Sequence, residues 1–231
     1  MRYQHLFFDL DHTLWDFDTN SREALLDIYQ DMNLADAGIY DFNLFHTLYL
    51  GHNERLWERY RNGFIRIDEL RWKRMAVTLL EFKNGDEALA RKMGLAFLDI
   101  LPTKKALFPD TAEVLNYLKE KKYKLHLITN GFEKIQHHKL KTSGIDGFFN
   151  EVITSEGSNS LKPHPEIFEF AMLKTGADKK ESIMIGDTPE VDILGAFRVG
   201  IDQVYVNHTG NKKLVHATYV VNALNELKHI F

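Results

Sequence analysis

Two aspartates near the N-terminus have a spacing that could support chemistry. Asp9 and Asp11 follow the apolar residues Leu6–Phe8, and Thr13 lies two positions further on. Carboxylates two apart at the end of a strand project to the same side and repel each other, and burying them is costly unless a cation compensates. An acidic surface turn is the simpler explanation. However, the apolar residues before Asp9 indicate a core strand, which favours a functional pair.

A second acidic cluster follows another apolar run. Asp187 comes directly after Ile183–Gly186, and Asp192 lies about one helical turn later. Asp187 could simply cap a helix that begins at Pro189, because carboxylates are favoured at helix N-termini. Capping does not explain why two carboxylates follow a buried strand. Asp9 and Asp187 together would form an oxygen-only site of the kind that suits Mg²⁺.

Two further segments carry weaker signals. Lys162 precedes Pro163 and lies close to Pro165, and these prolines restrict the surrounding backbone, so its position is expected to be fixed. Thr129-Asn130-Gly131 follows a third apolar run and could be only a turn. An ordinary loop lysine and an ordinary turn are the simpler explanations of each segment taken alone.

The elements that would position these residues are short strands alternating with helices. The strands are continuous apolar runs, as in a parallel sheet covered on both faces, and the pattern predicts a doubly wound, Rossmann-like α/β fold. Ligands bind beyond the carboxyl ends of such strands, so the polar residues above are expected to converge. The expected strands are Leu6–Leu10, Leu125–Thr129, Glu151–Thr154, Ile183–Ile185, Val204–Val206 and Tyr219–Val221, and the expected helices are Thr111–Lys121, Lys134–Thr142, Pro165–Thr175 and Pro189–Val199.

A helical segment interrupts this pattern after the first strand. Residues 16–101 lack β-branched runs and carry helical periodicity, which predicts an inserted four-helix bundle. The expected domains are therefore an α/β core of residues 1–15 and 102–231 and a helical domain of residues 16–101. Trp57, Tyr60 and Trp72 are expected in the bundle core, whereas Arg71, Lys73 and Arg74 are expected on a solvated helix face.

Composition excludes several classes of protein. The 231 residues include 29 Lys and Arg, 33 Asp and Glu and no cysteine, for a formal net charge of −4. Disulfide scaffolds, thiolate zinc sites, iron–sulfur clusters and cysteine nucleophiles are thereby ruled out, and the broad basic surface of a nucleic-acid-binding protein is missing. No apolar run has the length of a transmembrane helix or of a secretory signal. We therefore expect a cytoplasmic protein that binds neither membranes nor nucleic acid.

The motifs, in this order, resemble those of a known superfamily. The order DxDxT, TNG, KPxP and GDxxxxD is similar to the four motifs of the haloacid dehalogenase superfamily, over the whole chain, and the insertion matches its helical cap of the first type. Segments around Ile128–Phe132 with Gln136, Ser155-Glu156, Lys162–Phe168 and Met184–Thr188 further resemble the pyrimidine 5′-nucleotidase branch. One departure is Asn159, where such relatives carry glycine; asparagine is the next best residue for a positive φ.

The resemblance implies a Mg²⁺-dependent phosphatase of small phosphomonoesters. Asp9 would attack phosphorus to form an aspartyl-phosphate, and Asp11 would act as general acid and then general base. The metal would be held by Asp9, Asp187 and the main-chain carbonyl of Asp11. The remaining site residues would be Thr129, Asn130 and Lys162 on the phosphate, and Thr13 and Asp192 supporting the metal ligands.

The substrate implied is a small phosphorylated metabolite, and the finer resemblance implies a pyrimidine nucleoside monophosphate. Trp15 and Phe17 could stack on a nucleobase or simply pack at the hinge of the cap. His12 is expected to point away from the two aspartates, and the eleven histidines show no ligand spacing for a transition metal.

Three other functions stay open at this point. A phosphosugar phosphatase or mutase would use the same residues, and a mutase would protect the aspartyl-phosphate from water. A dehalogenase attacks carbon and needs no acid at position 11, so Asp11 argues against it. A non-catalytic phosphate-binding protein predicts a broken acidic set, and this set is intact. The sequence leaves the oligomeric state open.

Overall fold

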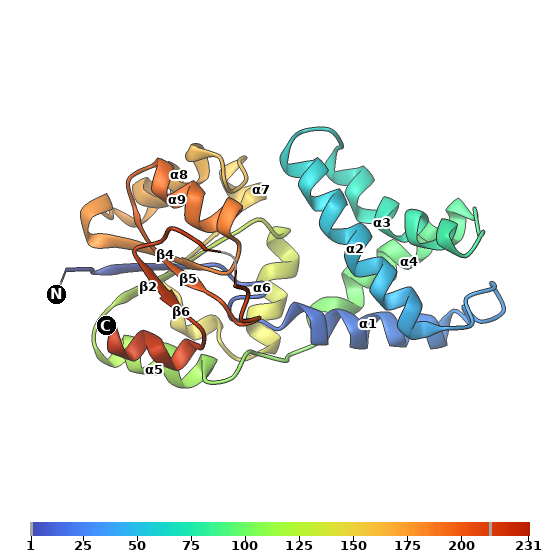
Figure 1. Cartoon of the computed structure of the whole chain (residues 1–231), viewed down its shortest axis with the longest axis horizontal. Coiled ribbons are helices and arrows are strands. Elements are labelled where there is room, and N and C mark those ends of the chain that lie inside the picture. The colour runs from blue at the N-terminus through green and yellow to red at the C-terminus, as the bar shows by residue number, and fades with distance from the viewer. Residues whose placement is uncertain (1, 213) are drawn as a thin grey trace. The chain divides into compact units, whose positions relative to one another are not determined.

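The chain forms two compact units in a computed structural model that describes residues 2–212 and 214–231 (Figure 1). One unit comprises Met1–Phe17 and Lys105–Phe231, and the other comprises Asp18–Lys104. The first is an α/β unit and the second is helical.

The α/β unit is built on a six-stranded sheet in which every strand pairing is parallel. The strand order is β3-β2-β1-β4-β5-β6, so the chain winds outward from β1 in both directions. This confirms the predicted doubly wound fold, and the order places a topological switch between β1 and β4. The strands are β1 (His5–Phe8), β2 (Lys124–Thr129), β3 (Glu151–Thr154), β4 (Ser182–Gly186), β5 (Asp202–Val206) and β6 (Tyr219–Val221).

Strand β1 is shorter than expected, and its end shapes the site. It stops at Phe8 rather than Leu10 because the chain turns immediately afterwards. The main-chain carbonyl of Leu10 accepts the N–H groups of Thr13, Leu14 and Trp15 at 3.3, 3.0 and 2.9 Å. The turn places Asp9, Asp11 and Thr13 in a short loop directly beyond the sheet.

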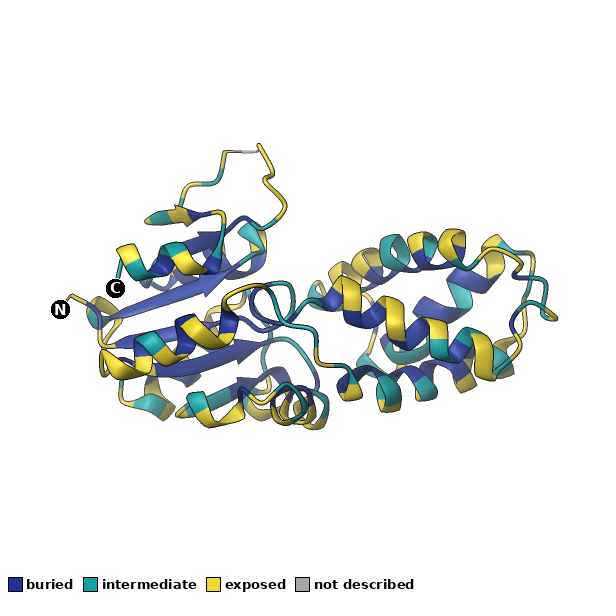
Figure 2. Cartoon of the chain, turned by 90° about the horizontal axis from the view of Figure 1, so that it is seen from below, coloured by how far each residue is buried: buried dark blue, intermediate teal, exposed yellow. Residues whose placement is uncertain are grey.

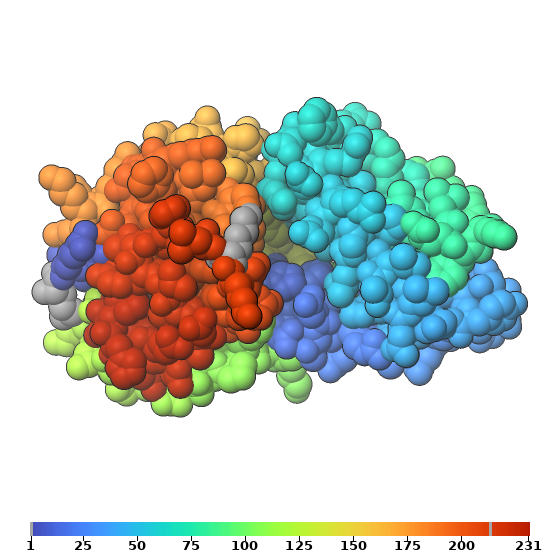
Figure 3. All heavy atoms as spheres, in the orientation of Figure 1, coloured from blue at the N-terminus to red at the C-terminus, as the bar shows by residue number. Residues whose placement is uncertain are grey.

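Helices cover both faces of the sheet (Figure 1). Helices α8 (Pro165–Thr175) and α9 (Leu194–Arg198) lie on one side, where Phe168 and Ala196 pack against Phe7, Ile128 and Met184. Helix α5 (Thr111–Glu120) lies on the other side, next to the short helix η5 (Leu224–His229). The Tyr117 hydroxyl donates a hydrogen bond of 3.4 Å to the Lys228 carbonyl, and Figure 3 shows the C-terminal residues in red on the outer surface there.

Two other α/β helices bear on the site. Helix α6 (Glu133–Thr142) follows β2, and the short α7 (Ser155–Ser158) follows β3. The expected helix Pro189–Val199 differs from the prediction: it begins as a π-helical turn over Pro189–Ile193 and becomes α-helical only in α9. Within this turn the Asp192 carboxylate accepts the Thr188 N–H at 3.0 Å, back across the start of the segment.

The helical unit contains four helices: α1 (Phe17–Asp31, which begins one residue before the unit), α2 (Phe42–Arg61), α3 (Ile67–Glu81) and α4 (Glu87–Ile100). Side-chain caps fix two of the starts. Asp41 accepts the Asn43 and Leu44 N–H groups before α2, and Asp86 accepts the Leu89 N–H before α4. Each helix buries one side and exposes the other (Figure 2).

Two expectations about side chains in the helical unit were wrong. Arg74 is buried rather than solvated, because its guanidinium donates to Asn53 Oδ1 at 3.0 Å and lies over the Phe97 ring. Trp57, Tyr60 and Trp72 are half-buried rather than in the core. The core instead contains Phe45, Tyr49, Met75, Leu79, Met93 and Phe97.

None of the helices in the described parts of the chain is long and apolar enough to cross a membrane.

Candidate active site

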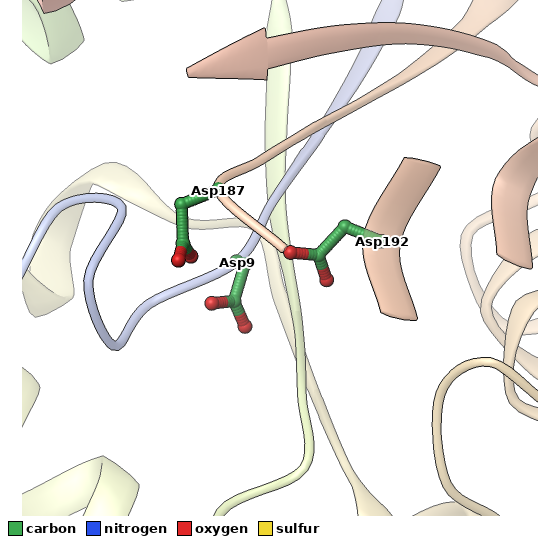
Figure 4. Close-up of side chains that lie close together, drawn as sticks. All are labelled: Asp9, Asp187 and Asp192. Atoms are coloured by element: carbon green, nitrogen blue, oxygen red, sulfur yellow. The ribbon is translucent and has the colours of Figure 1, made fainter. Parts of the chain in front are cut away.

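Three carboxylates meet at the topological switch of the sheet. Asp9 follows β1, Asp187 follows the neighbouring β4, and Asp192 lies in the turn after Asp187 (Figure 4). One oxygen atom from each of the three lies within 4.8 Å of the others. The structure therefore brings together three aspartates that the sequence singled out, although they are up to 183 positions apart in the chain.

Lys162 lies against two of these carboxylates. Its Nζ is 2.6 Å from Asp9 Oδ1 and 2.7 Å from Asp192 Oδ1, and the side chain is almost fully buried. Asn130, which follows β2, holds the backbone of this lysine in place: its Nδ2 donates to the Lys162 carbonyl at 2.9 Å and its Oδ1 accepts the Lys162 N–H at 2.7 Å. The lysine is fixed mainly by these contacts, in addition to the prolines that follow it.

The remaining polar contacts orient the two carboxylates after β4. Thr13 donates its hydroxyl to Asp187 Oδ1 at 2.9 Å, which joins the loop after β1 to the loop after β4. Asp192 is held at both oxygens, by Lys162 and by the Thr188 N–H. Gly186 permits this arrangement, since a Cβ there would lie 2.4 Å from Asp192 Oδ2.

The cluster holds more negative charge than Lys162 can neutralise. Three carboxylates face one ammonium, and burial penalises their charged forms. Burial raises the pKa of Asp9 from 3.8 to about 8, although Lys162 opposes the rise. Burial also raises the pKa of Asp187, to about 7, and the nearby Asp192 carboxylate adds to the effect. A site of this kind favours a bound cation.

Asp11 points to a different set of partners, on α6. Gln136 Nε2 donates to Asp11 Oδ2 at 3.0 Å, and Lys139 Nζ lies 2.6 Å from Asp11 Oδ1. The same Gln136 amide also donates to Thr129 Oγ1 at 2.6 Å. Lys139 is not among the residues that the sequence motifs indicated. The available signal was its spacing of three residues from Gln136, which places both side chains on one face of the predicted helix.

Trp15 and Phe17 are buried in the α/β unit and contact each other there. Their ring centroids are 6.3 Å apart, and Trp15 Nε1 donates to Ser143 Oγ at 3.1 Å. The Lys139 ammonium lies 4.2 Å from the centre of the Trp15 ring. These contacts give both rings a packing role, and stacking on a nucleobase stays a prediction.

Asn159 adopts the backbone conformation expected of it. Its φ is 53°, in the left-handed region, at the end of α7. The turn that precedes Lys162 is therefore formed with asparagine in a position that favours glycine.

A parallel sheet of this order, with acidic residues and a buried lysine at its switch point, defines a hydrolase of the haloacid dehalogenase type. The sequence model of the haloacid dehalogenase-like hydrolases matches residues 3–200. The chain therefore belongs to the haloacid dehalogenase-like hydrolase family.

Individual proteins resemble the chain over its full length. The pyrimidine 5′-nucleotidase PynA of Streptococcus pneumoniae is 30% identical over 230 residues, which cover 98% of this chain and 94% of that protein. The pyrimidine 5′-nucleotidase YjjG of Escherichia coli is 29% identical over 241 residues, which cover 100% of this chain and 98% of that protein. Among solved structures, the putative HAD-hydrolase YfnB of Bacillus subtilis, bound to magnesium, aligns with a TM-score of 0.90 at 27% identity. The alignment covers 100% of this chain and 99% of that chain.

Proposed function

We propose that this protein is a Mg²⁺-dependent phosphomonoesterase that uses Asp9 as its nucleophile. The observation that carries the proposal is the position of Lys162, whose buried ammonium contacts Asp9 at 2.6 Å beside two further carboxylates. A phosphate monoester adds about two negative charges to such a site. A carboxylate can approach phosphorus only where positive charge offsets this repulsion.

The donor set fits a hard divalent cation. The cluster offers only oxygen ligands, and its three carboxyl groups, once all are ionised as metal binding requires, leave a net charge of about −2 beside one lysine. Asp9, Asp187 and the main-chain carbonyl of Asp11 would hold Mg²⁺, while Asp192 and Thr13 keep the ligands in place through Lys162 and Asp187. When bound, the ion supplies positive charge beside the transferring phosphoryl group. The magnesium bound to the relative YfnB supports the choice of this ion.

The phosphate would be held by groups from two loops. Thr129 Oγ1 already accepts hydrogen bonds from Gln136 and from the Gly131 N–H, so its own hydroxyl hydrogen is left to donate to a phosphate oxygen. Lys162 supplies a fixed positive charge. The Asn130 side chain contacts the Lys162 backbone through both its amide nitrogen and its oxygen, and its main-chain N–H would be the group that reaches the phosphate.

The reaction follows from these positions in two steps. Asp9 attacks phosphorus, the bond from phosphorus to the ester oxygen breaks, and Asp11, which enters this step as the protonated acid, gives its proton to the leaving oxygen. A water molecule then attacks the aspartyl-phosphate, gives a proton to Asp11, and releases inorganic phosphate and free Asp9. One carboxyl group thereby serves as acid in the first step and as base in the second.

Pyrimidine nucleoside monophosphates are the substrates we propose. Support comes from PynA and YjjG, both pyrimidine 5′-nucleotidases, each of which aligns over nearly its whole length. The helical unit Asp18–Lys104 would act as the cap that excludes water and selects the leaving group.

A panel of phosphomonoesters tests the proposal. We expect Mg²⁺-dependent release of inorganic phosphate, with UMP, dUMP and dTMP hydrolysed at a higher kcat/KM than sugar phosphates, phosphoglycolate or FMN. If sugar phosphates rank equal to pyrimidine nucleotides, the nucleotidase assignment is wrong while the phosphatase stands. A mutase would move the phosphate without releasing it, and a binding protein would bind esters without turnover.

A further inference from the structure

A buried lysine near the site has no part in the mechanism above. The Lys139 side chain is only 3% exposed, and it lies on α6 rather than in any of the sequence motifs. Burying an ammonium is costly unless a partner compensates the charge. Here the partner is the general acid and base of the proposed reaction: Lys139 Nζ lies 2.6 Å from Asp11 Oδ1.

The surroundings of Lys139 restrict where its ammonium can be. The indole of Trp15 lies 4.2 Å from Nζ, measured to the ring centre, and the ring of Phe17 lies 5.7 Å away. Such cation–π contacts favour a charged lysine. The indole is itself fixed, because its Nε1 donates to Ser143 at the end of α6. The ammonium therefore lies against two aromatic rings and the Asp11 carboxylate.

Asp11 is held at both of its oxygen atoms. Lys139 contacts Oδ1, and Gln136, one helical turn earlier on the same helix, donates to Oδ2 at 3.0 Å. Two donors from one helix fix both torsions of a short carboxyl side chain. About a quarter of the Asp11 side chain is nevertheless exposed, so it can still reach a leaving group.

The orientation of the Gln136 amide supports the same positioning role for these two residues. Its Nε2 serves Asp11 and Thr129, while its Oε1 is buried without a hydrogen-bond partner among the described residues. A buried carbonyl without a hydrogen-bond partner is costly, and a glutamine with only a packing role would avoid that cost by turning its amide. The amide is thus held where Asp11 and the proposed phosphate ligand need it.

We propose that Lys139, together with Gln136, is a positioning residue that aims Asp11 at the leaving oxygen. The inference rests on the proposed function, because it takes Asp11 as the general acid. The loss of this positioning should affect some substrates more than others. Proton donation matters for esters with a poor leaving group, such as a nucleoside monophosphate, and hardly at all for p-nitrophenyl phosphate, whose leaving group departs as a stable anion.

The test compares kcat/KM for these two esters, since kcat/KM reports only the steps up to leaving-group release. Lys139→Met keeps the length of the stem and removes the charge. We expect its loss on UMP to exceed its loss on p-nitrophenyl phosphate by about tenfold or more, and Lys139→Arg to restore part of the ratio. Lys141→Met, an exposed lysine at the end of the same helix, should leave the ratio unchanged.

A double variant separates positioning from a general loss of structure. Asp11→Asn should show the same selective loss, and adding Lys139→Met to it should not change the ratio further, because Lys139 acts through Asp11. An equal loss on both esters, or additive losses in the double variant, would overturn the proposal. If Lys139→Met does not fold, Lys139→Gln takes its place in the same comparison. Absence of phosphatase activity in the unaltered protein would contradict the proposed function itself.

Discussion

Lys162 Nζ lies 2.6 Å from Asp9 Oδ1, and this contact joins the loop before α8 to the loop after β1. Both side chains are buried, and a second carboxylate, that of Asp192, lies 2.7 Å from the same ammonium. Stability and chemistry therefore depend on one positive charge, since removing it would leave two carboxylates facing each other in a site of low dielectric constant.

Removing this charge should cost both activity and stability. We expect Lys162→Met to abolish turnover and to lower the free energy of unfolding by about 3 kcal/mol, the typical cost of breaking a buried ion pair. Adding Asp192→Asn should recover part of the stability without restoring activity. The exposed pair Lys174–Glu151 offers a matched control, and Lys174→Met should cost less than about 1 kcal/mol. Urea unfolding of the four proteins measures the effect, and equal costs for the two lysines would contradict it.

Metal binding should release protons. In the metal-free protein, burial raises the pKa of Asp9 to about 8 and that of Asp187 to about 7, so both carboxyls carry protons in part near pH 7. Mg²⁺ requires the carboxylate forms, and its affinity should therefore rise between pH 6 and pH 8. Calorimetric titration in buffers of different ionisation enthalpy counts the protons released. A pH-independent affinity without proton release would refute the assignment of these ligands.

The same pKa values determine how stability depends on pH. The folded protein keeps protons that the unfolded chain loses near pH 4, so the metal-free protein should lose stability as the pH rises from about 4 to about 8. Saturating Mg²⁺ should reverse this loss at high pH. Thermal unfolding midpoints at pH 6 and pH 8, with and without the ion, give the comparison. If Mg²⁺ raised the unfolding midpoint more at pH 6 than at pH 8, the prediction would be wrong.

Any side chain at Gly94 should lower the stability of the helical unit. A Cβ at this position in α4 would lie 2.8 Å from the Arg71 carbonyl oxygen and 3.0 Å from Trp72 Cα, both in the backbone of α3. Gly94→Ala should therefore destabilise the protein by about 1–3 kcal/mol, although alanine normally stabilises a helix relative to glycine. Gly51→Ala in α2, where the new Cβ meets only Arg55 Nη2 at 3.9 Å, should be neutral or stabilising. Denaturant unfolding followed by circular dichroism compares the two, and equal effects would contradict the close approach of α3 and α4.

The sequence predicted the sheet and the position of the acidic cluster well, for a physical reason. Strands buried on both faces are apolar at most positions, so they and the polar residues that end them stand out clearly. Asp9, Asp187 and Asp192 could be identified because they follow such runs, and Lys162 because prolines lie beside it. The end of β1 at Phe8 could not, because it depends on hydrogen bonds to the Leu10 carbonyl.

Side chains on helices were harder to place. Hydrophobic periodicity shows which side of a helix is buried, but it does not show which residues pack against that side. Lys139 is one of several lysines on α6, and only the fold shows that this one contacts Asp11. Arg74 has charged neighbours in sequence, yet Asn53 on α2 provides a buried partner for it. The π-helical turn at Pro189–Ile193 replaces the start of a helix that the sequence predicted over Pro189–Val199. For Lys139 and Arg74 the missing information was a contact between segments that are distant in the sequence.

The proposed mechanism requires that Asp9 becomes phosphorylated during turnover. The most direct measurement mixes the protein with UMP and Mg²⁺, stops the reaction in acid within the first turnover, and locates the added phosphoryl group by peptide mass spectrometry. We predict that the group is on Asp9, and that Asp9→Asn, folded as judged by circular dichroism, neither carries it nor releases phosphate. A phosphoryl group on another residue, or phosphate release by Asp9→Asn, would contradict the account.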